Sequence, residues 1–207
     1  MKSIKLKAFG KINPTLEILS KKDNGFYSLA ISWHKISIYD EVEIVLDESQ
    51  KGVIEIFSEN TKVPQGKNAK KNNCYKAVLV LEEFLKTKDP QFKMPGIKIN
   101  IIKNLPMSGG LGGSATDASA TLNGLIILLN IKIDEKNRNI LASKIGHDCV
   151  FFCEDFCHAC GSEKTDQGVY LKKTPKLSGY LVLVVPKISI FSGDAYMGLK
   201  DREHKLF

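Results

Sequence analysis

The sequence contains no apolar run long enough to cross a membrane. Its longest apolar runs, at residues 124–129 and 180–186, fall far short of the roughly 18 residues that a spanning helix needs. The N-terminal residues also lack the roughly 7–15-residue apolar stretch of a secretory signal peptide. We therefore expect no membrane partner, and a protein of the cytoplasm or, in a eukaryote, of a plastid-type organelle.

Cysteine is scarce over most of the chain. Four of the five cysteines lie within residues 149–160, and the total is odd. Secreted disulfide frameworks usually spread an even number of cysteines along a short chain. The pattern therefore predicts reduced thiols.

Positive charge is in modest excess: the chain has 30 Lys and Arg residues against 23 Asp and Glu, which gives a net charge of +7. An excess of this size favours an anionic partner without choosing between nucleic acid, a phosphorylated metabolite and a membrane surface. The most basic stretch, residues 62–71, contains Lys67, Lys70 and Lys71 but no interleaved aromatic residue. Single-strand binders combine lysines with aromatic stacking platforms, so we predict an exposed loop and no nucleic-acid partner.

Strands and helices are interleaved along the chain. Alternation of apolar and polar residues predicts strands at residues 4–8, 16–19, 42–46, 54–56, 97–101, 169–172 and 180–185. Helical spacing predicts helices at residues 73–86, 114–130 and 134–145, and a short helix from Ser192. Asn72 or Asn73 is suited to cap the first helix, and Gly146 to end the third. The early hairpin-like strands argue against a purely doubly wound sheet, so the fold class expected is α+β.

A glycine-rich segment at residues 103–117 is the most informative part of the sequence. It follows a predicted strand, precedes a predicted helix, and contains Gly109, Gly110, Gly112 and Gly113. Glycines let backbone N–H groups approach an anion closely, and a helix N-terminus adds unpaired donors, an arrangement typical of phosphate sites. The alternative is a tight strand-to-helix turn. The segment has neither the Gly-Lys-Ser/Thr of a Walker A loop nor the spacing of a dinucleotide site.

Three further motifs accompany this glycine loop. They are AFGKIN at residues 8–13, DNGFY at residues 23–27 and GHDCVFF at residues 146–152. In this order and together with the loop, they resemble the GHMP kinases, named for galacto-, homoserine, mevalonate and phosphomevalonate kinases. The resemblance extends over nearly the whole chain. Within the group, the motifs are most similar to the branch that phosphorylates 4-diphosphocytidyl-2-C-methyl-D-erythritol to the 2-phosphate in non-mevalonate isoprenoid synthesis.

The resemblance implies transfer of the ATP γ-phosphate to a substrate hydroxyl. Lys11 matches the lysine that faces the transferred phosphoryl group, and Asp148 matches the aspartate that accepts the hydroxyl proton. Phosphoryl transfer depends mainly on positioning and on neutralising negative charge, so one cation and one carboxylate are a sufficient protein set. Taken alone, Lys11 would be read as a solvated strand lysine and Asp148 as a cap. Only the joint pattern favours catalysis.

The resemblance also implies the binding residues. The ATP phosphate-binding segment would comprise Pro106, Ser108, Gly109, Gly110, Leu111, Gly112, Gly113, Ser114, Thr116 and Asp117. Asn13 would contact the substrate, a cytidine diphosphate ester, while Phe26, Tyr27 and Tyr196 would surround its base. Mg²⁺ is expected to arrive with ATP, because the sequence shows no dedicated metal cage.

The cysteine cluster offers a different interpretation. Cys153, Cys157 and Cys160 have a spacing that resembles the iron–sulfur motif of radical S-adenosylmethionine enzymes, and further candidate ligands are Cys149, His147 and His158. That motif belongs early in a long barrel, whereas here it lies late in the chain. In the GHMP kinases the same segment aligns with an apolar strand, so we predict buried thiols and no metal site.

Several positions depart from the GHMP pattern. Tyr27 replaces a histidine, Ser114-Ala115-Thr116 replaces Gly-Ser-Ser, and Cys149-Val150 replaces Val-Pro. These departures leave open another GHMP small-molecule kinase, or a shortened, inactive homologue that only binds ligand.

The resemblance also predicts how the chain divides into domains. Residues 1–155 would form the N-terminal ATP-binding domain, resembling a domain of a ribosomal protein. Residues 156–207 would begin a ferredoxin-like C-terminal domain, left incomplete because the family's second glycine-rich motif is absent. The sequence makes no prediction of oligomeric state.

Overall fold

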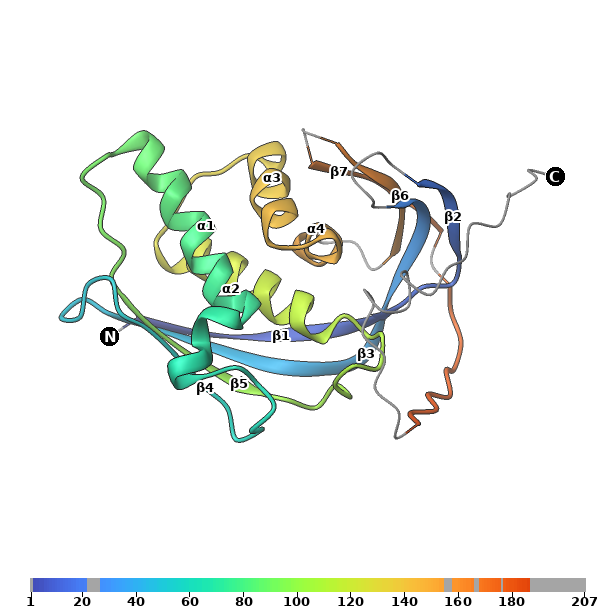
Figure 1. Ribbon diagram of the computed structural model, residues 1–207, viewed down its shortest axis with the longest axis horizontal. Helices are drawn as coiled ribbons and strands as arrows, with labels where there is room; N and C mark the ends of the chain where they lie inside the picture. Colours follow the sequence, from blue (N-terminus) through green and yellow to red (C-terminus); the bar gives the residue numbers. More distant parts are fainter. Residues whose placement is uncertain (1, 22–26, 155–157, 166–167, 176, 187–207) are drawn as a thin grey trace.

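A seven-stranded sheet with helices packed on one face forms the framework of the protein (Figure 1). The computed structural model describes residues 2–21, 27–154, 158–165, 168–175 and 177–186. In chain order, its elements are β1 (Lys2–Ile12), β2 (Leu16–Lys21), β3 (Tyr27–Asp47), β4 (Ile54–Phe57), the 3₁₀ helix η1 (Gly66–Lys71), α1 (Asn73–Lys88), β5 (Gly96–Ile102), α2 (Gly113–Leu128), α3 (Glu135–Ile145), α4 (His147–Cys153), β6 (His158–Thr165) and β7 (Gly168–Lys173).

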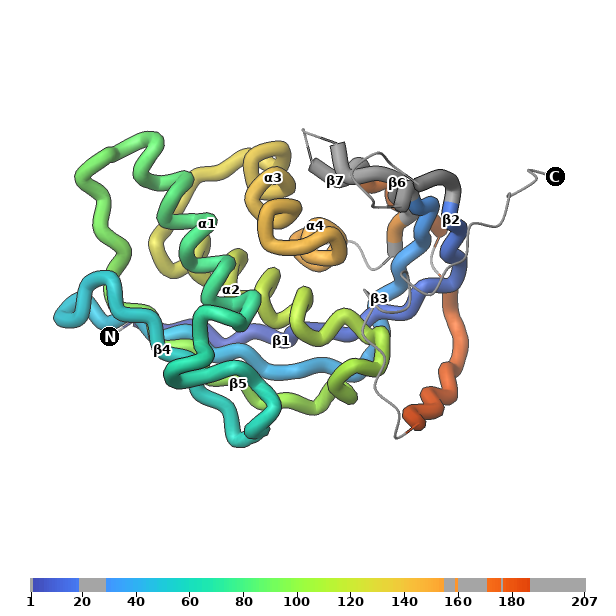
Figure 2. The backbone as a smooth tube through the Cα atoms, viewed as in Figure 1, coloured from blue at the N-terminus to red at the C-terminus, as the bar shows by residue number. Residues whose placement is uncertain are grey.

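The 21-residue strand β3 organises the sheet. Its C-terminal half pairs antiparallel with β1 on one side and β5 on the other, and β4 adds parallel to β5. Its N-terminal half pairs with β2 and β6, and β7 adds to β6. Figure 2 shows the C-terminal half of β3 running with β1 beneath α1 and α2. One strand therefore belongs to both halves of the sheet.

The core lies between the sheet and the helices. Alternate residues of β3 and β5 point into it because successive strand side chains face opposite sides of a sheet. The fully or nearly fully buried side chains include Val42, Ile44 and Leu46 of β3, Ile97, Ile99 and Ile101 of β5, Cys74, Ala77, Val78 and Leu81 of α1, and Leu122 and Leu125 of α2. Burial of these aliphatic groups is the main stabilising contribution, at about 1.5–3 kcal/mol for each large side chain.

Most of the predicted elements are confirmed, with the α+β class. The helix predicted at residues 73–86 is α1, and the Asn72 side chain caps it by accepting from Cys74 N–H at 2.9 Å. The third predicted helix is α3, capped by Asp134. Gly146 does end α3, but with an extended φ of −174° rather than a left-handed one, because it also serves as the N-cap of α4.

Two predictions of secondary structure are wrong. The cysteine cluster at residues 149–160, expected from the resemblance to align with an apolar strand, is helical in α4 as far as Cys153, and strand β6 begins only at His158; the buried face of α4 packs on α2 and α3. Residues 180–185 form no strand, and Tyr180, Val182 and Val184 are exposed. An isolated strand has no partner for its backbone, and no described strand pairs with this segment. The helix predicted from Ser192 lies outside the described residues.

The expected domain boundary falls at residues 155–157, outside the part of the chain that the structure describes. Beyond it, β6 and β7 continue the same sheet through their pairing with β3. The division into two domains stays a prediction. Within the described residues, no helix is long and apolar enough to span a bilayer.

Gly124 allows α2 to pack closely on the sheet. A Cβ atom here would lie 2.5 Å from Ile44 Cδ1 and 3.1 Å from Leu6 Cδ1. We expect Gly124→Val to lower the free energy of unfolding by about 2 kcal/mol, because overpacking a core forces the surrounding side chains to move. Urea unfolding measures this change. Ile127→Val, on the exposed face of the same helix, should alter stability by less than about 0.5 kcal/mol, and equal effects would contradict the packing argument.

Candidate active site at the glycine loop

The glycine loop connects β5 to α2 and has an unusual backbone. Ser108, Gly110 and Gly112 have positive φ values of 58°, 73° and 72°, in the left-handed region that favours glycine. Gly112 is the N-cap of α2 and no side chain caps the helix there. The first-turn N–H groups of α2 therefore remain available, and a helix N-terminus of this kind binds phosphate.

Gly112 also allows the loop to approach β1 and α4. A Cβ atom at this position would lie 2.9 Å from the Phe152 ring and 3.2 Å from Lys11 Cγ. Moreover, Lys11 N–H donates to the Leu111 carbonyl at 2.9 Å. The loop is thus held directly against the strand that contains Lys11.

The predicted phosphate-binding residues fall into two groups. Ser108, Gly109, Gly110 and Ser114 are exposed, and Pro106, Gly112 and Gly113 are partly exposed. Leu111, Thr116 and Asp117 are buried, at 4%, 3% and 4% exposure. The first group lines the outer side of the loop, whereas the buried side chains support the loop from within. Direct phosphate contact stays a prediction for the first group.

Lys11 lies at the C-terminal end of β1 and is only 7% exposed. Its Nζ donates to Asn13 Oδ1 at 2.6 Å, and Asn13 Nδ2 donates to the Ser32 carbonyl of β3 at 2.9 Å. The lysine predicted to be catalytic is therefore fixed by the asparagine predicted to contact substrate.

Asp148 lies in the first turn of α4, opposite Lys11. Its Oδ2 is 3.9 Å from Lys11 Nζ, while its Oδ1 accepts from Trp33 Nε1 at 3.0 Å. His147 Nδ1 lies 3.9 Å from the same Oδ1. The structure thus brings together the two predicted catalytic side chains from segments far apart in the sequence.

The electrostatic environment favours an ionised Asp148. Burial acts to raise the pKa of Asp148, but His147, Lys11 and Trp33 together hold this pKa below its ordinary value. Burial lowers the pKa of the Lys11 ammonium, and Asp148 opposes this effect only in part. An ionised carboxylate beside a partly desolvated ammonium is suited to accept a proton next to a bound phosphate.

A second charged cluster lies beneath the loop. The Lys103 ammonium binds Asp40 of β3 and, at 2.8 Å, Asp117 of α2. Asp40 Oδ1 also accepts the backbone N–H groups of Asn104 and Leu105, at 2.6 and 2.7 Å. All three charged side chains are at most 6% exposed. This cluster fixes both ends of the glycine loop to β3.

Within this cluster, Asp117 is the carboxyl group whose ionisation burial opposes. Burial, opposed by Lys103 and reinforced by the neighbouring Asp40, raises the pKa of Asp117 to about 7. The unfolded chain would lose this proton near pH 4, so between about pH 4 and 7 the folded protein binds more protons than the unfolded chain. The contribution of Asp117 to stability is therefore greatest below about pH 4 and decreases as the pH rises to about 7.

We expect wild type to lose stability relative to Asp117→Asn as the pH rises from about 4 to 8, because only the wild type must ionise this buried group. Urea unfolding of both proteins across this range measures the difference. As a control, Asp134→Asn removes an exposed cap whose pKa is lowered by hydrogen bonds from Asn137, so its pH dependence should lie below about pH 4. A pH-independent difference for Asp117→Asn would refute the expectation.

Sequence reasoning missed four residues of this arrangement: Trp33, Asp40, Lys103 and, as a neighbour of the carboxylate, His147. Lys103 is the first residue of the glycine-rich segment, so its place in the sequence could have suggested a role. Trp33 and Asp40 lie within β3, where nothing in their local pattern distinguishes them from other strand residues. Their roles depend on which distant segments pack against β3.

Most of the residues predicted to bind the base lie outside the described part of the chain. Phe26 and Tyr196 fall in segments that the structure does not describe, and Tyr27 is described only as the first backbone residue of β3. Their contact with a cytosine ring stays a prediction.

The cysteine cluster is divided by the fold. Cys149 and Cys153 are buried on α4, and burial raises the pKa of each thiol to about 12. Thiols with such pKa values are not reactive at neutral pH. Among the described residues, no group of three or more His, Cys, Asp and Glu side chains could hold a metal ion. Cys157 lies outside the described residues, and of His158 and Cys160 only the backbone is described.

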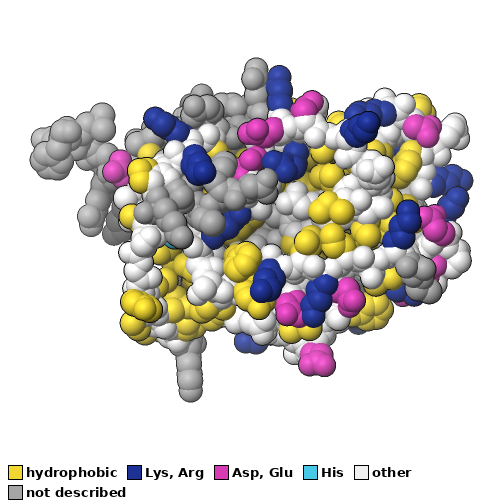
Figure 3. Space-filling view, turned by 180° about the vertical axis from the view of Figure 1, so that it is seen from behind, with side chains coloured by type: hydrophobic (Ala, Val, Ile, Leu, Met, Phe, Trp, Pro, Cys, Tyr) yellow, Lys and Arg dark blue, Asp and Glu magenta, His cyan; other side chains and the backbone are white. Residues whose placement is uncertain are grey.

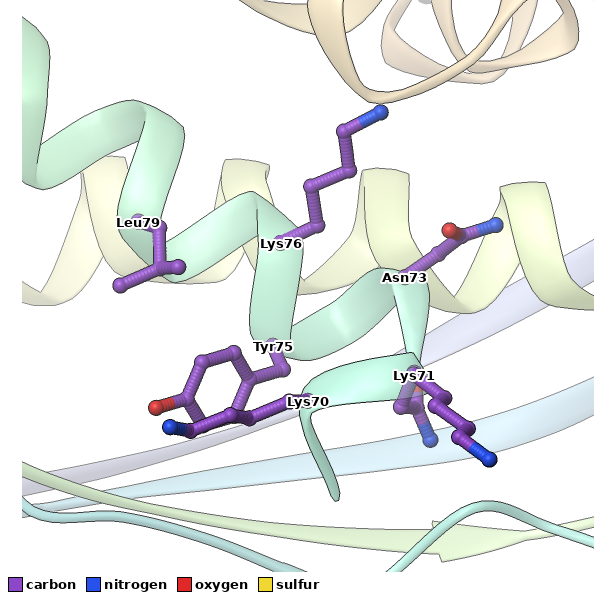
Figure 4. Close-up of a pocket in the computed structure, with 7 residues that line it drawn as sticks. Lys70, Lys71, Asn73, Tyr75, Lys76 and Leu79 are labelled. Atoms are coloured by element: carbon purple, nitrogen blue, oxygen red, sulfur yellow. The ribbon is translucent and has the colours of Figure 1, made fainter. Parts of the chain in front are cut away.

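A pocket of about 310 Å³ opens at the start of α1 (Figure 4). Its lining includes Lys70, Lys71, Asn73, Tyr75 and Leu79. In Figure 4 the Lys70 and Tyr75 side chains extend to the same side of the helix start, whereas Lys76 points away from them. Asn73 Nδ2 donates to Ser114 Oγ at 2.9 Å, so this pocket adjoins the first turn of α2.

Lysines on the molecular surface do not gather into a single patch in the view of Figure 3. On that face, Lys and Arg side chains are interspersed with Asp and Glu and with apolar groups. Lys67, Lys70 and Lys71 are exposed, as expected for the basic stretch, but η1 orders them rather than an irregular loop.

Comparison with known proteins identifies the domain. Residues 72–153, from the cap of α1 to the end of α4, match the family described as GHMP kinases N terminal domain. This region belongs to the GHMP kinase family. The matched region includes the glycine loop and Asp148, whereas Lys11 lies before it.

Relatives of this chain include two bacterial proteins named 4-diphosphocytidyl-2-C-methyl-D-erythritol kinase. The protein from Caldicellulosiruptor saccharolyticus is 31% identical over 94% of this chain and 62% of its own length. The protein from Acetivibrio thermocellus is 31% identical over 98% of this chain and 66% of its own length. The chain thus spans a little under two thirds of these relatives.

Solved structures share the fold. A crystal structure of 4-(cytidine 5'-diphospho)-2C-methyl-D-erythritol kinase aligns with a TM-score of 0.66 and 21% identity, over 96% of this chain and 65% of that chain. Homoserine kinase from Cytophaga hutchinsonii aligns with a TM-score of 0.59 and 20% identity, over 97% of this chain and 61% of that chain. At these identities, the likeness shows the fold.

Proposed function

We propose that this protein transfers the γ-phosphate of ATP to a hydroxyl of 4-diphosphocytidyl-2-C-methyl-D-erythritol, giving the 2-phosphate of the isoprenoid pathway. The observation that supports this reaction most directly is the meeting of Lys11 and Asp148 beside the uncapped N-terminus of α2. The names of the relatives support the choice of substrate.

In this proposal, Asp148 accepts the proton of the substrate hydroxyl. The hydroxyl oxygen then forms a bond to the γ-phosphorus, the bond between this phosphorus and the β,γ-bridging oxygen breaks, and ADP leaves. Lys11 stabilises negative charge on the transferred group, and the first-turn N–H groups of α2 hold the neighbouring phosphates. Lys11 Nζ lies 3.9 Å from Asp148 Oδ2, which allows the two side chains to act on one phosphoryl transfer.

The pocket at the start of α1 is the proposed site for the nucleoside of ATP. It adjoins the glycine loop through Asn73 and Ser114, and the Tyr75 ring offers an apolar surface. Exposed Lys70 and Lys71 add positive charge near the polyphosphate. A base bound here would leave the triphosphate extending across the loop toward Lys11.

Magnesium fits this arrangement as a companion of the nucleotide. Mg²⁺ commonly binds through one or two protein oxygens, several waters and substrate phosphates. The exposed Ser114 hydroxyl is the protein oxygen suited to hold it, since Asp117 is already paired with Lys103 and Asp148 is assigned as the proton acceptor. When bound, the ion would neutralise charge on the triphosphate.

Asp148→Asn and Lys11→Met should each lower kcat by at least about 10²-fold. The first removes the proton acceptor while keeping its size, and the second removes the charge while keeping the length. A coupled assay of ADP release measures this loss. Affinity for ATP, measured separately by calorimetry, should be nearly unchanged in Asp148→Asn.

Gly112→Ala provides the contrasting variant. An added Cβ meets Phe152 and Lys11 in a left-handed backbone, so the loop must move and ATP binding should weaken. If Asp148→Asn kept the wild-type kcat, the assignment of Asp148 as the base would be wrong.

Substrate choice provides an independent prediction. Phe26, Tyr27 and Tyr196 would surround a flat base, and aromatic stacking stabilises a bound base by about 1–3 kcal/mol. We expect calorimetry to show binding of the cytidine diphosphate ester and none of mevalonate, homoserine or galactose. Equal affinity for mevalonate and the cytidine compound would instead favour another GHMP small-molecule kinase, an alternative suggested by Tyr27 in place of histidine.

A further inference from the structure

We propose that Trp33 is a positioning residue for the catalytic carboxylate: its indole N–H fixes the orientation of Asp148, so that one carboxylate oxygen faces Lys11 and the substrate. The inference rests on the proposed function, in which Asp148 is the base. Trp33 lies in β3 and Asp148 in α4, 115 positions apart in the sequence. It is therefore the tertiary fold that brings the donor to the carboxylate.

The two oxygens of Asp148 have different partners. Oδ1 accepts from Trp33 Nε1 at 3.0 Å, and His147 Nδ1 lies 3.9 Å from the same atom. Oδ2 faces Lys11 Nζ at 3.9 Å, a distance longer than a hydrogen bond. With Oδ1 bound by the indole, Oδ2 is the oxygen left to accept the proton, and the Asp148 side chain is 31% exposed.

Trp33 is itself held rigidly. It is 1% exposed, and its ring stacks on Phe151 with centroids 5.9 Å apart and planes 18° apart. Its backbone pairs with Ala159 of β6, which is fully buried. The centroid of the His147 ring lies 5.6 Å from that of the indole. A donor fixed by packing on several sides loses little entropy when it holds the carboxylate, which is how supporting residues orient a reactive group.

A phenylalanine would preserve much of this packing but not the N–H group. The role of the hydrogen bond can therefore be separated from the role of the ring. The charged and titratable groups that face Asp148 are Lys11 from β1, and His147 and Cys149 from its own helix α4. Each of them must be considered when the ionisation of Asp148 is followed.

The chain contains a single tryptophan, so its indole N–H gives one resonance in a ¹H–¹⁵N spectrum. We expect this resonance to lie downfield in the full chain at neutral pH and to move upfield as acid protonates Asp148. In Asp148→Asn the titration should disappear. His147→Gln removes the neighbouring imidazole, and the titration of the indole resonance should persist in this variant. These measurements need no activity.

Kinetics tests the consequence for catalysis. Trp33→Phe should lower kcat about three- to tenfold with little change in KM for ATP, because orientation is lost but no nucleotide contact is removed. The acid limb of the kcat profile should shift upward by about half to one pH unit, since the ionised carboxylate loses a donor that stabilises it. Phe151→Leu is the matched control: it loosens the same packing without removing the N–H, and should leave the acid limb in place.

The results separate this inference from the proposed function. If the indole resonance still titrated with acid in Asp148→Asn, or if the acid limb of the kcat profile did not move in Trp33→Phe, the role of Trp33 would be overturned whatever the substrate. An indole resonance that titrates with Asp148 in a protein without kinase activity would uphold the bond and refute the proposed function instead.

Discussion

The close contact at Gly112 is the constraint on which the candidate site depends. A left-handed residue without a side chain lets the loop lie against Lys11 of β1 and Phe152 of α4 at the same point. The backbone bond from Lys11 to Leu111 then fixes the distance between the phosphate-binding helix terminus and the lysine. Any larger residue would separate these three segments, because the space that it needs is already filled.

Charge is used in two ways around this contact. Near the outer side of the loop, Lys11 and Asp148 lie 3.9 Å apart, and the Asp148 side chain is 31% exposed, so this carboxylate can interact with substrate. Below it, Lys103 pairs with both Asp40 and Asp117 in a site closed to solvent. Removal of one partner from such a buried cluster leaves an uncompensated charge, which is strongly destabilising. The upper pair is suited to chemistry and the lower cluster to holding the loop in place.

Strand β3 connects these two sites. Its residue Asp40 belongs to the buried cluster, its residue Trp33 holds Asp148, and the Ser32 carbonyl accepts from Asn13. A strand that pairs with β1, β2, β5 and β6 has little freedom to shift, because each movement would break several ladders of hydrogen bonds. The side chains that it presents therefore keep fixed positions relative to the loop.

The sequence by itself determined the α+β class, most strands, three of the helices and the glycine loop, because these depend on local periodicity, caps and backbone freedom. Lys11 and Asp148 could be named as a pair only through the resemblance of whole motifs. The tertiary structure alone decided that residues 147–153 form a helix, that residues 180–185 form no strand, and that Asp117 points inward. It also decided that Trp33, Asp40 and Lys103 support the site. Such roles arise from contacts between segments far apart in the chain, and no local pattern of residues encodes which segments will meet.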